Sequence, residues 1–291
     1  MAGLEIKVGT YNVNNLFDRF DDPYSWSDDR WNKRSTKPKS LDEIFHIGQR
    51  LREDEPDVIA FQEVEGKGVL YEFNVSQLGR HFRDLALIPA NDPRNIDVAV
   101  ASTLPLGQIV SYQFIRDLET GQKLFSRDLL EVEVLHPESP GQRLFTIFVS
   151  HLKSKWVDPS LNAADEAAAR DRAERLRWQQ AHMIASIVRA RFPNPNALYI
   201  VAGDLNDTPD SAPLRPLLQN PQLQLVDVLQ ALPQADRWTY HWKKEDQYSQ
   251  IDYLLLSPTL AQYVVPESAH VQQHRHISGS DHRPVYVTLQ F

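Results

Sequence analysis

The sequence predicts a layered α/β fold in which strands and helices alternate and polar residues follow the strands. One observation is the apolar run at 197–201, which lacks polar alternation and lies between Pro195 and Gly203. Such a run is typical of a strand buried on both faces. A second observation is the segment 163–192, rich in Ala, Arg and Glu, whose apolar residues form one helical stripe. Sheets packed against helices are therefore expected.

Taken in order, the apolar patterns predict the remaining elements. Alternating or continuous apolar runs indicate strands, and apolar residues three or four positions apart indicate helices. Turn-forming residues at 136–141 separate two alternating segments, which predicts a hairpin. The predicted helices are 41–52, 69–82 and 163–192, and the predicted strands or short apolar elements are 6–13, 56–61, 97–102, 125–134, 144–150, 197–201, 225–229, 238–242, 250–257, 270–276 and 285–291.

Length and composition favour one globular domain. The 291 residues fit one large domain or two ordinary ones. The apolar share of 42% and the charged share of 24% are those of a globular protein with a sizeable core. Because no internal repeat, low-complexity segment or linker interrupts the pattern, we predict a single domain over residues 1–291.

Charge, cysteine content and the N-terminus narrow the class of protein. A net charge of −8 argues against binding polyanions by bulk attraction, although a local basic rim or a bound cation would still permit a nucleic-acid enzyme. The absence of cysteine excludes disulfides and thiolate metal sites. No signal peptide or membrane span is recognisable, so we expect a cytoplasmic protein, although a trimmed secreted chain would look the same. We also expect a monomer.

Polar residues follow several predicted strands. Asp204 and Asn206 come after 197–201, and in an extended segment residues two apart face the same side. Glu63 follows 56–61, where a plain loop would favour Gly, Asn or Ser. His151 and Asn12 end two further strands. Each has an ordinary alternative, because Asp, Asn and Gly are common turn formers and a single His is often structural.

Together, these strand ends predict a metal-assisted site. An Asp at 252 and an Asp-His pair at 281–282 add to the set late in the chain. If the strand ends meet at one edge of packed sheets, they form a pocket of oxygen ligands with two imidazoles. Oxygen ligands without Cys suit a hard cation such as Mg²⁺ or Mn²⁺. Such a cation beside His and Asn suits phosphate-ester chemistry.

The sequence also resembles the endonuclease/exonuclease/phosphatase superfamily, which includes deoxyribonuclease I. The resemblance covers nearly the whole chain and keeps the order of the family's motifs. Each motif alone is a weak pattern, whereas the ordered set is specific. The motifs are Thr10-Tyr11-Asn12, Gln62-Glu63, Ser150-His151, Gly203-Asp204-Leu205-Asn206, Ile251-Asp252-Tyr253 and Ser280-Asp281-His282-Arg283-Pro284. The resemblance implies a four-layer α/β sandwich of two mainly antiparallel sheets packed face to face, with helices outside.

The resemblance also implies roles for these residues. Glu63 resembles the main metal ligand, with Asn12 beside it and Asp281 available to the metal. Asp204 resembles the group that orients or deprotonates the attacking water, and Asn206 resembles a donor to the phosphoryl oxygen. His282 resembles the imidazole that contacts the phosphate. In this resemblance it is held by Asp252, which would fix its tautomer and stabilise imidazolium.

Three residues point to deoxyribonuclease I rather than to AP endonucleases, and His151 points to the sphingomyelinases as well. A His at the strand end where His151 lies is found in deoxyribonuclease I and the sphingomyelinases but not in the AP endonucleases. Arg127 resembles a phosphate-contacting Arg, and Asp97 lies where deoxyribonuclease I has a carboxylate paired to the first His. We hypothesise that an Asp97–His151 pair protonates the leaving oxygen; the alternative for Asp97 is a solvated residue at the start of a strand. Asn14 departs from the AP endonuclease pattern, which has Asp there.

The sequence thus predicts a phosphodiesterase that depends on Mg²⁺ or Mn²⁺, in particular a nuclease acting by in-line attack of water. Its partner is nucleic acid, with DNA favoured over RNA, or a small phosphate ester. Arg127, Lys153 and Lys155 are candidates for a positive rim. The alternatives are a phosphomonoesterase, a lipid or inositol phosphate phosphodiesterase and a catalytically silent binding module. The loops 18–40 and 234–250 and their tryptophans would decide the substrate, by stacking on bases, touching lipid or packing inside.

Overall fold

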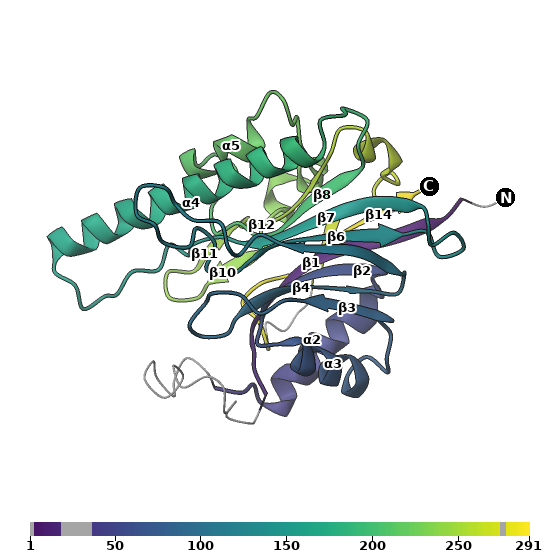
Figure 1. Cartoon of the computed structure of the whole chain (residues 1–291). Helices are drawn as coiled ribbons and strands as arrows, with labels where there is room; N and C mark the ends of the chain where they lie inside the picture. Colours follow the sequence, from purple (N-terminus) through teal and green to yellow (C-terminus); the bar gives the residue numbers. More distant parts are fainter. Residues whose placement is uncertain (1–2, 19–36, 274–277) are drawn as a thin grey trace.

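The computed structural model describes residues 3–18, 37–273 and 278–291, which form four layers (Figure 1). Two six-stranded sheets pack face to face, with helices α2 and α3 outside the first sheet and α4 and α5 outside the second. The predicted four-layer α/β sandwich is therefore confirmed. Among the described residues the α-helices are α2 (Leu41–Asp54), α3 (Lys67–Ser76), α4 (Ala163–Arg191) and α5 (Arg215–Leu218).

Both sheets are mainly antiparallel, and each contains one central parallel pair. The first sheet has the order β13-β14-β1-β2-β4-β3, in which β1 and β2 are parallel. The second sheet has the order β5-β6-β7-β8-β12-β9, in which β7 and β8 are parallel. The strands of the first sheet are β1 (Glu5–Leu16), β2 (Val58–Val64), β3 (Asp84–Leu87), β4 (Asp97–Ser102), β13 (His270–Val271) and β14 (Val285–Gln290). Those of the second are β5 (Leu106–Ser111), β6 (Leu129–Leu135), β7 (Arg143–His151), β8 (Tyr199–Asp204), β9 (Val226–Asp227) and β12 (Asp252–Leu256).

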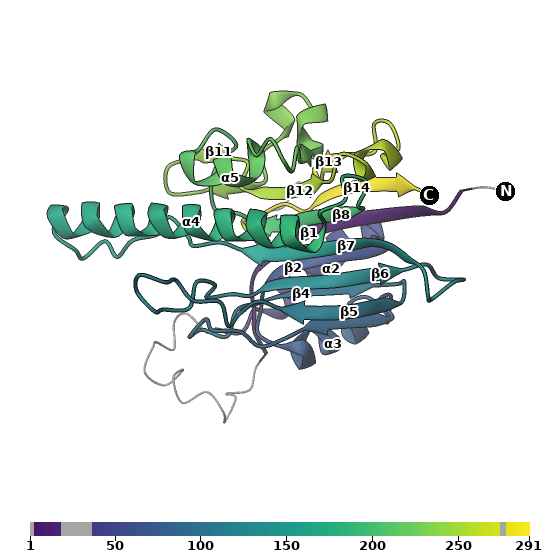
Figure 2. The same ribbon diagram turned by 45° about the horizontal axis from the view of Figure 1, so that its top comes forward.

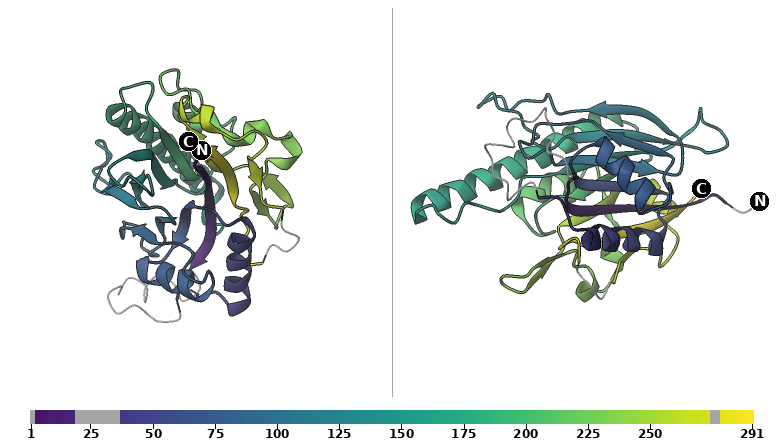
Figure 3. Two further views of the ribbon diagram at one scale, coloured as in Figure 1. Left: turned by 90° about the vertical axis from the view of Figure 1, so that its right-hand side faces the viewer. Right: turned by 90° about the horizontal axis from the view of Figure 1, so that it is seen from below.

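Three apolar clusters hold the layers together. The largest fills the space between the two sheets and includes Val8, Ile147 and Leu254. A second lies between the second sheet and α4, and a third lies between the first sheet and α2 and α3. The view along the strands shows the sheets stacked between their helices (Figure 3). Because β8 is covered on both faces, all six of its residues are buried, as its unbroken apolar run predicts.

The topology brings the polar strand ends to one edge of the sandwich. Strands β1, β2, β7 and β8 finish there, because the strands of each parallel pair point the same way. Strands β4, β6, β12 and β14 begin there, because each is antiparallel to one of those four strands. Residues that lie far apart in sequence are therefore neighbours at this edge.

Local sequence explains where the main helices begin. Ser40 accepts a hydrogen bond from the backbone N–H of Glu43, whose side chain accepts one from Ser40 N–H, so α2 starts with a capping box. Asn162 accepts a hydrogen bond from Asp165 N–H and caps α4 in the same way. The first half of α4 extends beyond the sheets (Figure 2). No helix among the described residues is long and apolar enough to span a membrane.

The structure departs from the sequence prediction at several boundaries. Helix α3 covers residues 67–76 rather than 69–82, and residues 125–128 precede β6 instead of belonging to it. Strands β3 and β5 were not predicted. Within 234–250 a hairpin forms from β10 (Tyr240–Trp242) and β11 (Gln247–Ser249). Most of the predicted loop 18–40, including Trp26 and Trp31, lies outside the described residues.

Candidate active site

The second sheet contributes three side chains at one level of the site edge. His151, at the end of β7, is in register with Asp204 at the end of β8, and Asp204 is in register with Asp252 at the start of β12. Residues directly opposite each other in neighbouring strands place their side chains on the same face. All three residues are buried. The sheet therefore presents a row of one imidazole and two carboxyl groups.

The first sheet faces this row with residues from β1 and β2, and both strands are irregular there. The register between them shifts after Asn12, and the register between β2 and β4 shifts around Glu63. Glu63 and Asn14 adopt left-handed backbone conformations, with φ of 65° and 52°. Bulges and positive φ redirect side chains out of the regular alternation. Here they turn the Glu63 and Asn14 side chains toward the site edge.

Gly203 allows the close approach of β8 to β7 beside Asp204. Its φ is 132°, and a Cβ atom at this position would lie 1.9 Å from the backbone oxygen of Ser150. Only glycine avoids both the steric clash and the conformational strain. The Gly-Asp order in the sequence therefore serves to position the Asp204 carboxylate.

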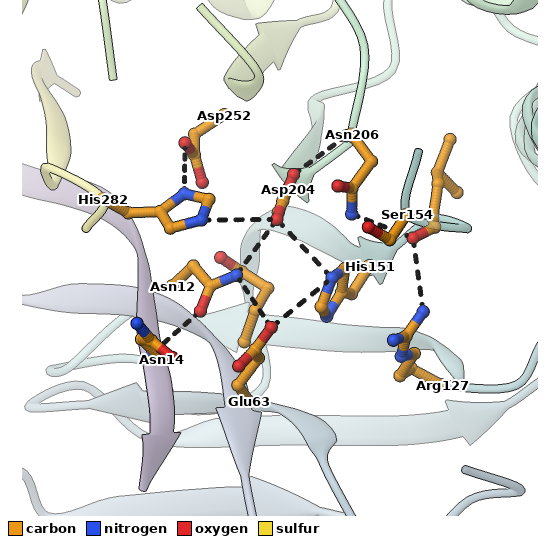
Figure 4. Close-up of polar contacts among 12 residues, drawn as sticks. Asn12, Asn14, Glu63, Arg127, His151, Ser154, Asp204, Asn206, Asp252 and His282 are labelled. Carbon is orange, nitrogen blue, oxygen red and sulfur yellow. Dashed lines mark hydrogen bonds and ion pairs between the residues drawn. The ribbon is translucent and has the colours of Figure 1, made fainter. Parts of the chain in front are cut away.

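Asp204 lies at the centre of the polar contacts (Figure 4). Its Oδ2 accepts a hydrogen bond from Asn12 Nδ2 at 3.0 Å and lies 3.5 Å from His151 Nε2 and 3.8 Å from His282 Nε2. Asn12 Nδ2 also lies 3.4 Å from Glu63 Oε1, which is 3.9 Å from His151 Nε2. Three nitrogen atoms from three different segments thus surround one carboxylate oxygen, and the Asn12 nitrogen donates a hydrogen bond to it.

The His282 imidazole is held by a chain of hydrogen bonds. Its Nδ1 lies 2.8 Å from Asp252 Oδ2, which also accepts a hydrogen bond from the Thr239 hydroxyl at 2.6 Å. The Ser280 hydroxyl accepts the His282 backbone N–H and donates to the Asn12 carbonyl, which ties the His282 segment to β1. Burial alone lowers the pKa of His282, but the carboxylates of Asp252 and then Asp204 outweigh it and raise that pKa to about 10. The ring is therefore an imidazolium at neutral pH.

The surroundings of the Asp204 carboxyl group disfavour its charged form. Burial and the nearby Asp252 raise its pKa, while the His282 cation and hydrogen bonds from Asn206 N–H and Asn12 oppose that rise. Asn206 is also left-handed, with φ of 54°, and its side chain donates to the Leu152 carbonyl at 3.0 Å. A raised pKa makes a carboxylate a stronger proton acceptor.

His151 differs from His282 in its charge state. Burial first, and then the Arg127 guanidinium, lowers the pKa of His151 well below its usual value, so the ring is neutral. Its Nδ1 is buried and has no hydrogen-bond partner among the residues that the structure describes. The expected hydrogen bond between His151 and Asp97 is therefore not formed. Asp97 Oδ1 instead accepts the Ala90 backbone N–H at 3.0 Å, and its carboxyl is buried rather than solvated at the start of β4.

Arg127 and Asp281 lie at opposite sides of the centre. Arg127 is buried, and its Nε lies 2.9 Å from Asp92 Oδ2 while its Nη1 reaches the Leu152 carbonyl at 3.4 Å. Asp281 Oδ1 accepts a hydrogen bond from Asn14 Nδ2 at 2.8 Å and lies 4.0 Å from His282 Nε2. Arg127 thus reaches the centre through its contact with the loop after β7, and Asp281 is directly adjacent to it.

Carboxylate oxygens from both sheets fit a hard divalent cation. Glu63 and Asp204 share the single Asn12 amide, and the described residues offer Glu63 Oε2 no hydrogen bond. Such a local excess of carboxylate oxygen matches the ligand chemistry of Mg²⁺ or Mn²⁺. One potential ligand atom from each of Asp204, Asp252 and His282 also lies within 4.8 Å of the other two, a spacing that metal ligands can have. The Nδ1 of His282 is already engaged by Asp252, so we interpret these three as a hydrogen-bonded His282–Asp252 pair with Asp204 in ion-pair contact with the ring.

Several supporting residues have no sequence signal of their own. Thr239 and Tyr240 come from the predicted short strand, and the Tyr240 ring lies 4.9 Å from the His282 ring. Asp92, which pairs with Arg127, lies in a loop. Of the expected positive rim, Lys155 lies 2.5 Å from Asp207 Oδ1 in an ion pair, which offsets its charge. Ser280, which supports the His282 segment, lies by contrast inside one of the motifs noted in the sequence.

Comparison with known proteins places the chain in a family. The profile of the Endonuclease/Exonuclease/phosphatase family matches residues 9–282, so the chain belongs to this family, whose name covers enzymes that hydrolyse phosphoric esters. The resemblance found in the sequence is confirmed. No curated protein sequence matches the chain.

Solved structures share the fold at low sequence identity. Truncated TDP2 from Caenorhabditis elegans is 18% identical with a TM-score of 0.63, and the match covers 99% of this chain and 98% of that one. The human nocturnin catalytic domain, with a bound sulfate anion, is 15% identical with a TM-score of 0.67, covering 99% and 96%. An AP endonuclease from Archaeoglobus fulgidus is 16% identical with a TM-score of 0.62, covering 98% and 99%. These likenesses concern the fold.

Proposed function

We propose that this protein is a divalent-metal-dependent phosphodiesterase, and specifically a nuclease, that hydrolyses phosphodiester bonds by in-line attack of water. The observation that supports it best is the meeting of Asn12, His151 and His282 nitrogens around Asp204 Oδ2, at 3.0, 3.5 and 3.8 Å. A proton acceptor surrounded by fixed hydrogen-bond donors suits a reaction in which water attacks an anionic phosphoryl group.

Each residue has a role in this proposal. Asp204 accepts the proton of the attacking water. His282, held as an imidazolium by Asp252, donates to a non-bridging phosphoryl oxygen and stabilises the charge that develops there. His151 is neutral and offers an N–H to the phosphoryl or leaving oxygen. Asn12 and Asn206 donate through their amides, and Arg127, paired with Asp92, positions the loop after β7.

The metal belongs to the same proposal. Glu63 and Asp281, with the Asn12 amide oxygen, would hold Mg²⁺ or Mn²⁺, which when bound supplies a Lewis acid that offsets phosphoryl charge. Asn14 holds Asp281 through the 2.8 Å hydrogen bond and is thus a positioning residue. Without a cation, the carboxylates of Glu63, Asp204 and Asp281 would repel an anionic substrate.

A nucleic-acid substrate is favoured by cationic side chains on both sides of the centre. Arg94, Arg127 and Lys153 lie on the His151 side, close enough to lower the pKa of that ring. Lys39 lies on the other side, within range of the Glu63 and Asp281 charges. A strand of phosphates crossing the site would meet positive charge before and after the scissile bond.

The test is a substrate and metal survey with purified protein. Plasmid, single-stranded DNA, RNA, bis-p-nitrophenyl phosphate and p-nitrophenyl phosphate are incubated with Mg²⁺, Mn²⁺ or EDTA. The proposal expects cation-dependent cleavage of the diesters, abolished by EDTA, and a loss of about 100-fold or more in kcat for Asp204→Asn. Asp210→Asn, an exposed carboxylate on the same loop, is the matched control and keeps full activity. Hydrolysis of the monoester alone would overturn the proposal.

A further inference from the structure

A cavity of about 260 Å³ opens beside Asp281, on the side of the site away from His151. Its walls come from the segment before α2, from the β10–β11 hairpin and from residues 279–281. The cavity therefore lies between the last residues of loop 18–40 and the 234–250 segment, the two regions whose sequence could not identify a substrate. Lys39, Trp242, Lys243, Lys244 and Asp281 are among the lining residues.

The cavity is fixed relative to the catalytic centre by backbone contacts. Tyr240 forms a β-bridge with His282, and the His241 N–H donates to the Asp281 carbonyl at 3.1 Å. The Arg283 N–H donates to the Thr239 carbonyl at 2.6 Å, and Thr239 also holds Asp252. The hairpin that supports the imidazolium thus also carries Lys243 and Lys244, at a fixed position relative to His282.

The charges of the cavity favour an anion. Three lysines line it, against the two carboxylates of Glu43 and Asp281. Glu43 Oε2 is occupied by the Ser40 backbone N–H and hydroxyl, at 2.9 and 2.8 Å. Lys243 and Lys244 form no ion pair among the described residues, and Lys39 Nζ is fixed by the Gly279 carbonyl at 2.5 Å. Lys243 and Lys244, which lie in a hollow without ion-pair partners among the described residues, would lower their mutual repulsion by binding a phosphate.

An aromatic surface lies next to these ammonium groups. Trp242 is 40% exposed at the cavity, although a tryptophan is normally covered. Adjacent cationic and aromatic groups are the usual combination for binding single-stranded nucleic acid, in which phosphates pair with Lys and bases stack on aromatic rings.

Resting on the proposed function, we propose that this cavity is a subsite for the phosphate adjacent to the scissile one along a nucleotide strand, with the attached base stacked on Trp242. Lys243 and Lys244 bind that phosphate, and Lys39 closes the wall nearest Asp281. The subsite makes the protein select substrates with two phosphates in series over those with a single one.

The experiment compares a dinucleotide that has one internal phosphodiester with versions that carry an additional 5′ or 3′ terminal phosphate. The subsite predicts that one of the two additions raises kcat/KM for cleavage of the internal bond. In Lys243→Gln/Lys244→Gln this gain falls by about tenfold, mainly through KM. Lys67→Gln/Arg189→Gln removes two exposed charges elsewhere and leaves the gain unchanged. Replacing the terminal nucleoside by an abasic one removes only the stacked base. The resulting loss in kcat/KM should match the loss caused by Trp242→Ala.

The outcomes separate the subsite from the chemistry. Cleavage of the plain dinucleotide without a gain from either terminal phosphate contradicts the subsite and leaves the phosphodiesterase proposal intact. A gain that survives in Lys243→Gln/Lys244→Gln also contradicts it. Equal rates with nucleoside and abasic ends contradict the stacking on Trp242. No cleavage of any diester overturns the proposed function itself.

Discussion

Buried titratable residues show how position sets charge at the scale of single side chains. His282 and His151 lie on either side of Asp204, yet the first is an imidazolium and the second is neutral. The difference arises because His282 contacts Asp252 directly, whereas the surroundings of His151 are dominated by burial and the Arg127 guanidinium. One site therefore holds both a charged and a neutral hydrogen-bond donor.

Asp97 gives a pH-dependent prediction for stability. Burial, and then the Asp92 and Asp128 charges, raise its pKa to about 7, above the unfolded value of about 3.9. The contribution of Asp97 to the free energy of unfolding is therefore fully present below about pH 4. It is lost as the pH rises from about 4 through 7, by at most about 4 kcal/mol. Asp97→Asn keeps an acceptor for the Ala90 N–H without ionising. We expect its free energy of unfolding, measured by urea titration, to exceed that of the wild type by about 1–3 kcal/mol at pH 8 and not at pH 4.

Asp171→Asn, an exposed carboxylate on α4, serves as the control and should leave the pH profile unchanged. Parallel stability curves for wild type and Asp97→Asn between pH 4 and 8 would show that Asp97 is not buried as a neutral acid.

The candidate site residues and the contact between Asp252 and His282 were predicted from motifs, whereas supporting residues such as Thr239 and Asp92 were not. Glu63, Asp204 and His282 each follow or precede a recognisable strand, so sequence order was enough to select them. Asp97 and His151, which the hypothesis joined as a pair, form no hydrogen bond with each other among the described residues, and Asp97 Oδ1 accepts the Ala90 N–H. Such pairings depend on loop geometry, which the sequence pattern does not encode.

At the scale of elements, irregular strands position the chemistry. The bulges at Glu63 and after Asn12 break the alternation of β2 and β1 at the site edge. Positive φ at a non-glycine residue costs on the order of 1 kcal/mol or more, and it persists where surrounding structure enforces it. The cost at Glu63 is consistent with selection for function rather than for stability.

Gly203 gives a prediction at this scale. Gly203→Ala places a methyl group 1.9 Å from the Ser150 oxygen and at φ 132°, which forces β7 and β8 apart. We expect a loss of at least about 2 kcal/mol in the free energy of unfolding by urea titration. Gly68→Ala in α3 meets no atom within 4 Å, so this control should be neutral or stabilising by up to about 1 kcal/mol. Equal stability for the two variants would refute the close approach of the strands.

The elements with strong burial patterns were the ones that the sequence predicted well. Strand β4 has the predicted bounds, and α4 ends one residue before the predicted boundary at 192. Strand β5 was missed because none of its residues is fully buried, so its apolar pattern is weak. Arg177 and Gln180 lie on the buried face of α4, where polar side chains bond the loop after β7 and the Leu124 carbonyl, a placement that periodicity alone does not reveal.

At the scale of the whole molecule, the first and last strands of the described chain lie side by side. Strand β14, near the C-terminus, pairs with β1 near the N-terminus, and the apolar cluster between the sheets includes residues from both. We propose on this basis that residues 1–291 form one domain that unfolds cooperatively. Urea unfolding followed by tryptophan fluorescence and by far-ultraviolet circular dichroism should give coincident transitions. Two separated transitions would indicate independent units.

The central claim is that Glu63, Asp204 and His282 act on one phosphoryl centre. The most direct measurement is kcat/KM for bis-p-nitrophenyl phosphate, at saturating Mn²⁺, for Glu63→Gln, Asp204→Asn, His282→Asn and the Asp204→Asn/His282→Asn double variant. Groups that act as a unit are strongly non-additive. We predict a loss of about 100-fold or more for each single variant, with the double variant within about threefold of the worse single one. Losses that multiply in the double variant, or single variants with full activity, would contradict the account.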